Sequence, residues 1–255
     1  MKTKISAAAI LLASTSLSFA ADMAVKAPMV APAAVWSWTG FYIGGHAGAG
    51  WGTTETTLTA ITGAPAIPGG IALTQNSKSG FLGGGQAGYN WQSGWAIFGV
   101  QGDIAGMDVK GTSPCLGIGP SCTAKSDWLA TVTGRVGGVV ADRTLVYVKG
   151  GAAWMHTDHN FSVPAGFGRG GGTSVSSSST SWGWLLGLGA EYALSPNWSA
   201  FIEYNYIEFD KKNIALDVSA FAGAPAIANI DVKNKLSVAK VGVNYKFGGP
   251  AVGWY

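Results

Sequence analysis

The sequence is poor in charged residues. Asp, Glu, Lys and Arg make up 11% of its 255 residues, whereas soluble globular domains contain about 25%. So few charges argue against a large surface in contact with water. Without Lys2 and Lys4, which precede an apolar run at the start of the chain, the 16 basic residues fall to 14, against 13 acidic ones. This balance excludes the basic surface of a nucleic-acid-binding protein, and we expect no nucleic-acid partner.

Long apolar runs are missing after residue 20. Residues 1–20 read MKTKISAAAILLASTSLSFA, in which two lysines precede an uncharged run and small residues flank Phe19. This pattern is typical of a secretory signal peptide, here cleaved before Ala21. No later stretch holds the roughly 18 apolar residues that a transmembrane helix needs. The sequence therefore predicts an exported chain without a membrane-spanning helix.

Cysteine is scarce, with only Cys115 and Cys122, in the segment TSPCLGIGPSCT. In the oxidising compartment of an exported protein, this spacing predicts a local disulfide within a loop. A metal-binding or redox pair is poorly supported, because the sequence has no C-x-x-C motif.

Glycine, by contrast, is abundant, with 39 residues. Each glycine costs about 1 kcal/mol in a helix interior, so the composition disfavours a helical protein. Gly83, Gly85 and Gly88 have the G-x-G-x-x-G spacing of a dinucleotide-binding loop, which requires a helix after the last glycine. Residues 89–91 continue an alternating pattern instead. We therefore interpret these glycines as part of a curved sheet.

Eight segments after residue 37 alternate apolar with polar or glycine residues, which indicates β-strands with two different faces. They read WTGFYIGGHAGAGW, FLGGGQAGYNWQ, AIFGVQGDIAG, WLATVTGRVGG, LVYVKGGAAW, WGWLLGLGAEY, SAFIEYNYIEF and LSVAKVGVNYKF. Short connections at 92–94, 141–143 and 195–197 alternate with long ones at about 52–78, 107–126, 155–180 and 210–233. Outer-membrane barrels have short periplasmic turns and long extracellular loops. The sequence predicts an all-β fold, an eight-stranded antiparallel transmembrane β-barrel with four long extracellular loops.

Ionisable residues indicate which face lines the lumen. Six of them, three acidic and three basic, lie in the middle of the segments on the polar face: Asp103, Arg135, Lys149, Glu191, Glu203 and Lys240. A lone charge facing lipid near the bilayer midplane would cost roughly 2–4 kcal/mol. We therefore predict a balanced charge network in the lumen. Gly84 and Gly88 would face the same lumen and make room for large side chains such as Arg135 and Tyr147.

Aromatic residues gather at the segment ends. Those near the short connections are Trp91, Trp95, Trp198, Tyr245 and Phe247, and those near the long ones are Trp51, Trp128, Trp154, Trp182 and Trp184. Two aromatic girdles are expected where a barrel wall leaves the lipid.

The predicted organisation is a signal peptide over 1–20, an Ala/Pro-rich periplasmic leader over 21–37, a barrel over 38–247 and a tail over 248–255. We expect Phe247 to close the last strand, because Gly248, Gly249 and Pro250 follow it. The alternative end is Tyr255.

Two loop features stand out. The low-complexity run 169–180 is predicted to be mobile. The sequence GAPAI occurs at 63–67 and again at 223–227. The first and last long loops are neighbours in a closed barrel, so we predict that the two copies lie side by side.

Several motifs carry a family resemblance: WTGFYIGG, FGVQGDI, WLATVTGRVG, DRTLVYVKGGAAW, GLGAEYALSPNWSAFIEYNYIEF and VGVNYKF. In this order they resemble the porin-family outer-membrane β-barrel proteins of alphaproteobacteria, relatives of small surface immunogens and haemin-binding proteins. The resemblance implies the cell outer membrane as location, with lipid and lipopolysaccharide as surroundings. It also implies insertion by the barrel-assembly machinery, which reads an aromatic residue at the end of the last strand, here Phe247.

The leading functional hypothesis is a structural barrel that contributes to envelope integrity and surface presentation. An eight-stranded interior is just wide enough for side chains to fill, so we expect no wide open pore. A small-solute porin is one alternative.

Binding of haem or a host ligand through the loops is a second alternative. His156 and His159 in WMHTDHNF, and His46, which we place near the outer end of the first segment, are residues of the type that would bind haem or a metal. Apart from haem in this alternative, we expect no cofactor and no metal. We also expect no enzyme, because loop serines such as Ser162 and Ser174 have no patterned base partner.

Overall fold

A computed structural model of the chain describes residues 36–63, 69–114, 121–141, 143–162, 164–165, 172, 174–217, 219 and 225–248. All belong to one compact unit, Ala34–Tyr255. Within these residues no helix is long and apolar enough to span a membrane. The described residues form nine strands: β1 Gly40–Thr62, β2 Ile71–Ser93, β3 Ala96–Pro114, β4 Ser121–Val140, β5 Thr144–Ser162, β6 Ser174–Ala193, β7 Trp198–Phe209, β8 Lys212–Asp217 and β9 Ile227–Lys246.

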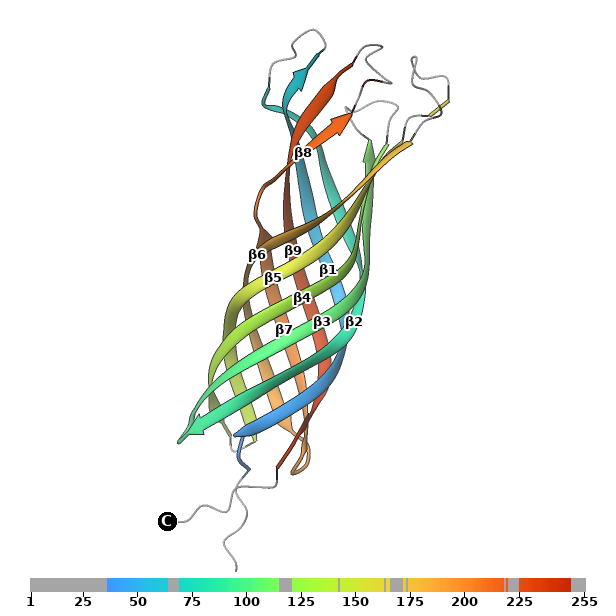
Figure 1. Cartoon of the computed structure of the whole chain (residues 1–255). Helices are drawn as coiled ribbons and strands as arrows, with labels where there is room; N and C mark the ends of the chain where they lie inside the picture. Colours follow the sequence, from blue (N-terminus) through green and yellow to red (C-terminus); the bar gives the residue numbers. More distant parts are fainter. Residues whose placement is uncertain are drawn as a thin grey trace, which may run out of the picture. The chain divides into compact units, whose positions relative to one another are not determined.

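The strands close into a barrel in which every pairing is antiparallel (Figure 1). Neighbours follow the chain from β1 to β7, after which β9 pairs with both β7 and β1. The short β8 pairs with β9 beyond the end of β7, so it continues the position of β7 in the wall. The wall thus has eight strand positions, and the predicted eight-stranded antiparallel barrel is confirmed.

Short turns join the strands at one end of the barrel. The turn between β2 and β3 contains Gly94, whose φ of +59° suits glycine. Ala141, between β4 and β5, has a φ of +53°, which is uncommon for a residue with a Cβ. These turns lie within two residues of the predicted ones.

At the other end, the strands continue through most of the residues predicted as long loops. β5 and β6, for example, pair as far as Ser162 opposite Ser174. The run 169–180, predicted to be mobile, therefore contributes its residues from Ser174 onward to a strand. Thr- and Ser-rich segments satisfy their backbone groups in the sheet without needing an apolar outer face. The loop bounds expected at about 52–78, 107–126, 155–180 and 210–233 are therefore too wide.

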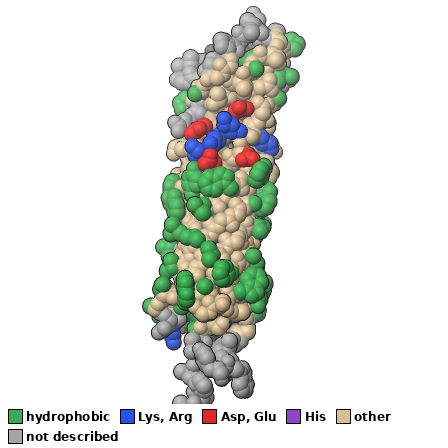
Figure 2. Space-filling model, turned by 90° about the vertical axis from the view of Figure 1, so that its left-hand side faces the viewer, with side chains coloured by type: hydrophobic (Ala, Val, Ile, Leu, Met, Phe, Trp, Pro, Cys, Tyr) green, Lys and Arg blue, Asp and Glu red, His purple; other side chains and the backbone are tan. Residues whose placement is uncertain are grey.

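The wall changes character along its length. We call residues 40–51, 81–93, 96–106, 128–140, 144–154, 182–193, 198–206 and 238–246 the turn half, and the other strand residues the loop half. In the turn half, large apolar side chains such as Val132 and Leu188 are exposed. In the loop half the pattern reverses: on β3, Val109 is buried while Asp108 and Lys110 are exposed. Figure 2 shows hydrophobic side chains over one stretch of the wall and a belt of charged ones beyond it.

Both aromatic girdles predicted from the sequence lie on this outer face. Trp91, Trp95, Trp198 and Phe247 are exposed near the short turns. At the border with the loop half, the exposed tryptophans are Trp51, Trp128, Trp154, Trp182 and Trp184.

The two GAPAI copies meet where their residues are described. Thr62 of β1 lies opposite Ile227 of β9, and a Cβ on Gly63 would lie 2.1 Å from the carbonyl oxygen of Pro225. The predicted neighbourhood of the copies is confirmed for these residues. Positions 64–67, 223 and 224 lie outside the described residues.

Candidate functional site in the barrel lumen

The lumen brings together the six ionisable residues that the sequence predicts to face it, and all six are buried. Glu203 of β7 is central: its carboxylate lies 2.7 Å from Lys149 Nζ and 3.2 Å from Lys240 Nζ. It also accepts a hydrogen bond of 2.7 Å from the hydroxyl of Tyr147. Lys240 in turn lies 2.6 Å from Asp103 Oδ2. Four charges of alternating sign therefore form a chain across β3, β9, β7 and β5.

The remaining two charges, Arg135 and Glu191, form a separate ion pair of 3.2 Å. The Arg135 guanidinium lies 4.7 Å from the ring centroid of Tyr42 and 5.0 Å from that of Tyr147, which adds cation–π attraction. Glu191 also accepts a hydrogen bond of 2.7 Å from the amide of Asn244. Buried charges are tolerated when they are paired and hydrogen-bonded, and both conditions are met here.

Amide side chains join the two groups. Gln86 accepts a hydrogen bond of 3.4 Å from Lys240 and donates one of 2.8 Å to Asn244. Asn244 donates in turn to Glu191. Gln101 donates a hydrogen bond of 3.1 Å to Gln86. These amides therefore connect the two charged groups into one continuous network. In the sequence they already lie on the polar face of the alternating segments.

His46 of β1 also belongs to this network. Its Nε2 lies 2.8 Å from Asp103 Oδ2, and its side chain is fully buried. The expectation that His46 lies near the outer end of the first segment is wrong, because β1 continues to Thr62 and leaves His46 deep in the turn half.

Glycines leave room for large side chains in the lumen, but the glycine and side-chain partners differ from the predicted ones. A Cβ on Gly88 would lie 2.4 Å from the hydroxyl oxygen of Tyr42, and one on Gly84 would meet the backbone of β3. The prediction that Gly84 and Gly88 accommodate Arg135 and Tyr147 is therefore wrong. The ring of Tyr147 lies over a glycine of β6 instead, because neighbours across the lumen depend on strand register.

An apolar layer crosses the lumen next to the network, at the border of the two halves. Its buried residues are Leu82, Ala105, Met107, Val109, Leu129, Ala153, Met155, Leu185, Ile207, Phe209, Leu236 and Val238. They come from every strand position except that of β1. There, a Cβ on Gly50 would lie 3.4–3.7 Å from side chains of Val109, Leu236 and Leu82. The layer therefore reaches the whole circumference.

Beyond the apolar layer lies Lys78, a buried cation that the sequence pattern does not predict. Its Nζ donates hydrogen bonds of 3.4 Å to Ser126 and 3.3 Å to Asn234. Residues 52–78 were expected to form a loop, so the lumen-facing position of Lys78 on β2 went unrecognised.

A second apolar cluster lies at the short-turn end of the lumen. Trp38 is buried there with Ile97 and Leu145. Trp36 packs against this cluster, and its ring centroid lies 4.7 Å from Lys246 Nζ. The sequence assigned Trp36 to the leader 21–37, but the structure places it on the barrel. Ser37, which follows it, is also described, and its carbonyl oxygen accepts a hydrogen bond from Lys246 Nζ. Residues 21–35 of the leader lie outside the described residues.

A small cavity lies inside the described part of the lumen. This cavity, between the charge network and the apolar layer, is lined by residues of both, among them His46, Asp103, Lys149 and Leu185, and measures about 10 Å³. That is about the volume that one water molecule requires.

The two histidines considered as a haem or metal pair do not come together. Three residues apart on β5, they lie on opposite faces of the strand. His156 is on the outer face, with Nδ1 3.2 Å from Thr180 Oγ1, and His159 is half-buried on the lumen side. The predicted pair does not form, because residues 156–159 belong to a strand and not to a loop.

Two further predicted residues lie at strand ends. Cys122, near the start of β4, is disulfide-bonded, while Cys115 lies outside the described residues. Phe247 follows β9 directly, and its backbone N–H donates a hydrogen bond of 2.8 Å to Phe41. Residues 249–255, including Tyr255, are not described.

Comparison with known proteins identifies the family. The model described as "outer membrane protein beta-barrel domain" matches residues 9–247. The 31 kDa outer-membrane immunogenic protein of Brucella melitensis is 33% identical, over 97% of this chain and 100% of its own. The 25 kDa outer-membrane immunogenic protein of Brucella canis is 27% identical, over 97% and 99%. The solved structure of OprG from Pseudomonas aeruginosa is 13% identical, with a TM-score of 0.49, over 85% and 100%. By the family match and the 33% identical relative, the chain belongs to the outer-membrane β-barrel family and is located in the outer membrane.

Proposed function

We propose that the protein is a structural barrel of the outer membrane that contributes to envelope integrity without an open pore and presents its loop half at the cell surface. The filled lumen is the observation that carries this proposal. An ion crossing the barrel would meet the apolar cluster at Trp38, the charge network and the apolar layer in turn. Eight-stranded barrels are just wide enough for side chains to fill them.

The polar outer face of the loop half supports surface presentation. Exposed or partly exposed lysines, each close to an acidic side chain, occupy the belt beyond the hydrophobic band: Lys110, Lys125, Lys233 and Lys235. Such ammonium groups suit the phosphates of lipopolysaccharide, which we propose as the surrounding partner at this level. The Brucella relatives are named outer-membrane immunogenic proteins, and a surface position agrees with that name. We propose no catalytic role.

Planar-bilayer conductance of the refolded protein tests the absence of a pore. We expect no stable conductance steps from the folded barrel, with folding checked by the different gel mobility of heated and unheated samples. A porin reconstituted in the same bilayer shows that steps would be detected. Large, stable steps from this protein would contradict the proposal.

A further inference from the structure

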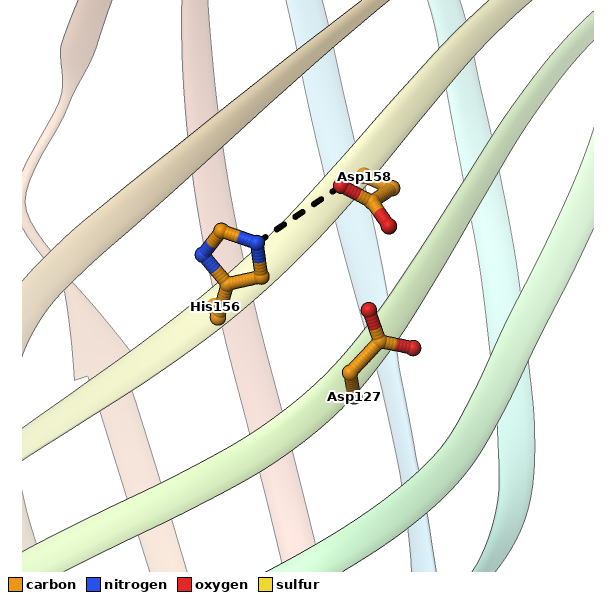
Figure 3. Close-up of side chains that lie close together, drawn as sticks. All are labelled: Asp127, His156 and Asp158. Atoms are coloured by element: carbon orange, nitrogen blue, oxygen red, sulfur yellow. Dashed lines mark ion pairs between the residues drawn. The ribbon is translucent and has the colours of Figure 1, made fainter.

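A second cluster of ionisable side chains lies on the outer face of the barrel, apart from the lumen network (Figure 3). Asp127 comes from β4, and His156 and Asp158 come from β5. Each offers one ligand atom, and these atoms all lie within 4.8 Å of one another. In Figure 3 the imidazole and the two carboxylates point toward one another. One nitrogen and two oxygens are thus held on two neighbouring strands.

An irregularity in strand pairing brings Asp127 into this group. Ser126 lies opposite Thr157, and Trp128 lies opposite His156, so Asp127 is an extra residue between two pairs. In a regular strand, two successive side chains point to opposite faces. Here the bulge re-aims one of them, as bulges do, and Asp127 and Trp128 both reach the outer face.

Neighbouring side chains fix the orientation of His156. Its Nδ1 lies 3.2 Å from Thr180 Oγ1. Its ring stacks on Trp128 at an interplanar angle of 3°. Its Nε2 therefore faces Asp158, whose Oδ1 is 3.6 Å away, beyond hydrogen-bond distance. Histidines that bind metals are commonly held in this way by a hydrogen bond at the other ring nitrogen.

We propose that Asp127, His156 and Asp158 bind one divalent transition-metal ion, for which Zn²⁺ serves as the probe. Zn²⁺ binds imidazole nitrogen and carboxylate oxygen at about 2.0–2.2 Å, so tetrahedral ligands lie roughly 3.4 Å apart. Closing the cluster from 4.8 Å requires the side chains of Asp127, which is partly exposed, and Asp158, which is exposed, to rotate toward the imidazole. The imidazole favours Zn²⁺ over Mg²⁺ and Ca²⁺, which prefer oxygen ligands. A fourth position stays open to water.

The ammonium group of Lys125 competes with a metal ion for the carboxylate of Asp127. Its Nζ lies 3.4 Å from Asp127 Oδ1 and 4.0 Å from Asp108 Oδ1. The ammonium supplies part of the positive charge that the metal ion would supply, so binding requires Lys125 to swing away. Removing this ammonium should therefore strengthen metal binding.

Calorimetric titration of the refolded, untagged protein with ZnCl₂ in a zwitterionic detergent tests the proposal. We expect one Zn²⁺ per barrel, and affinity at least tenfold lower in His156→Gln and in Asp127→Asn. The matched control is His159→Gln, three residues along β5 on the opposite face, which should bind Zn²⁺ as the unchanged protein does. Lys125→Gln should bind several-fold more tightly.

Cobalt gives a direct signature of the imidazole. Co²⁺ bound to the unchanged protein should show visible absorption bands that change in His156→Gln and persist in His159→Gln. Unchanged Zn²⁺ affinity in both His156→Gln and Asp127→Asn would overturn the proposal. Equal loss in His156→Gln and His159→Gln, or equally tight binding of Mg²⁺, would do the same. Gel mobility identifies any variant that fails to fold, and the other ligand variant then decides.

Discussion

The turn half and the loop half of the same strands differ in which face is apolar. The outer face is apolar in the turn half, and in the loop half the apolar side chains lie mostly on the lumen face. On β9, Val241 and Val243 point outward and Lys240 points into the lumen, whereas further along Lys235 points outward and Leu236 is buried. Lipid outside the turn half requires an apolar outer face, and its polar residues can only be paired inside. Outside the lipid, where we propose that the loop half lies, water permits the arrangement of a soluble barrel. The surrounding solvent, rather than the strand, therefore decides which face carries the charges.

Strand β7 contributes a glutamate to one ion pair in each half of the barrel, so the two halves can be compared on a single strand. Glu203 lies 2.7 Å from Lys149, and Glu208 lies 2.6 Å from Lys233. The side chains of the first pair are 0–1% exposed, and those of the second are 25–30% exposed. By distance alone, the two ion pairs would be expected to contribute equally to stability. Burial makes the first pair costly to break, while solvent weakens the second.

Glu203→Gln should have the largest effect of the changes considered. It leaves Lys149 and Lys240 in the lumen without their shared carboxylate. Removing one partner of a buried pair costs about 3–5 kcal/mol. Urea unfolding of the barrel in lipid vesicles should show a loss of this order.

The control is Glu208→Gln, the same substitution on the same strand in the loop half. It should shift the unfolding midpoint less, because the pair it breaks is partly exposed to solvent. If the two variants lose equal stability, the distinction between the halves is wrong for charges.

On the outer face, a new charge should destabilise the turn half, which faces lipid, and leave the loop half almost unchanged. Leu188→Lys places an ammonium in the lipid-facing wall and should cost about 2–4 kcal/mol in the same unfolding measurement. Ser176→Lys, on the same face of β6 in the loop half, should change stability little, since both positions are exposed but only the first faces lipid. Equal losses at the two positions would mean that lipid reaches Ser176.

How much the sequence could predict follows from the same comparison. In the turn half, an apolar stripe opposite isolated charges such as Glu203 and Lys149 indicated both the strands and the lumen network. In the loop half the outer face is polar, as at Thr53 and Lys235, and the strand signal resembles that of a loop. Lys78 was missed for this reason.

Other features depend on contacts between strands and leave no local signal. Asp127 reaches His156 only because the β4–β5 register shifts by one residue, and alternation along one strand cannot show a shift between two. Similarly, Gly88 makes room for Tyr42 from the neighbouring strand β1. The register between neighbouring strands, rather than the residue pattern along one strand, determines which side chains meet at these two places.

The smallest expected effect is the pH dependence of the exposed pair on β7. Glu208 lies beyond the membrane-spanning turn half, and the hydrogen bond from Lys233 holds the pKa of its carboxyl below the ordinary value of 4.5. A lowered carboxyl pKa stabilises the fold above the ordinary value, and the stabilisation is lost as pH falls through the folded value. The same hydrogen bond raises the pKa of Lys233 above its ordinary 10.5, so the stabilisation is also lost on raising the pH through that folded value.

The stability difference between the unchanged protein and Glu208→Gln should therefore be constant from about pH 5 to pH 10 and shrink on either side. Unfolding midpoints across this range measure it, and Lys233→Gln should show the same window because it breaks the same pair. A difference that grows below pH 5 would contradict the ion pair as its source. Since solvent reaches this partly exposed pair, added salt should reduce the difference throughout the window. The loss in Glu203→Gln, whose pair is buried, should change far less with salt.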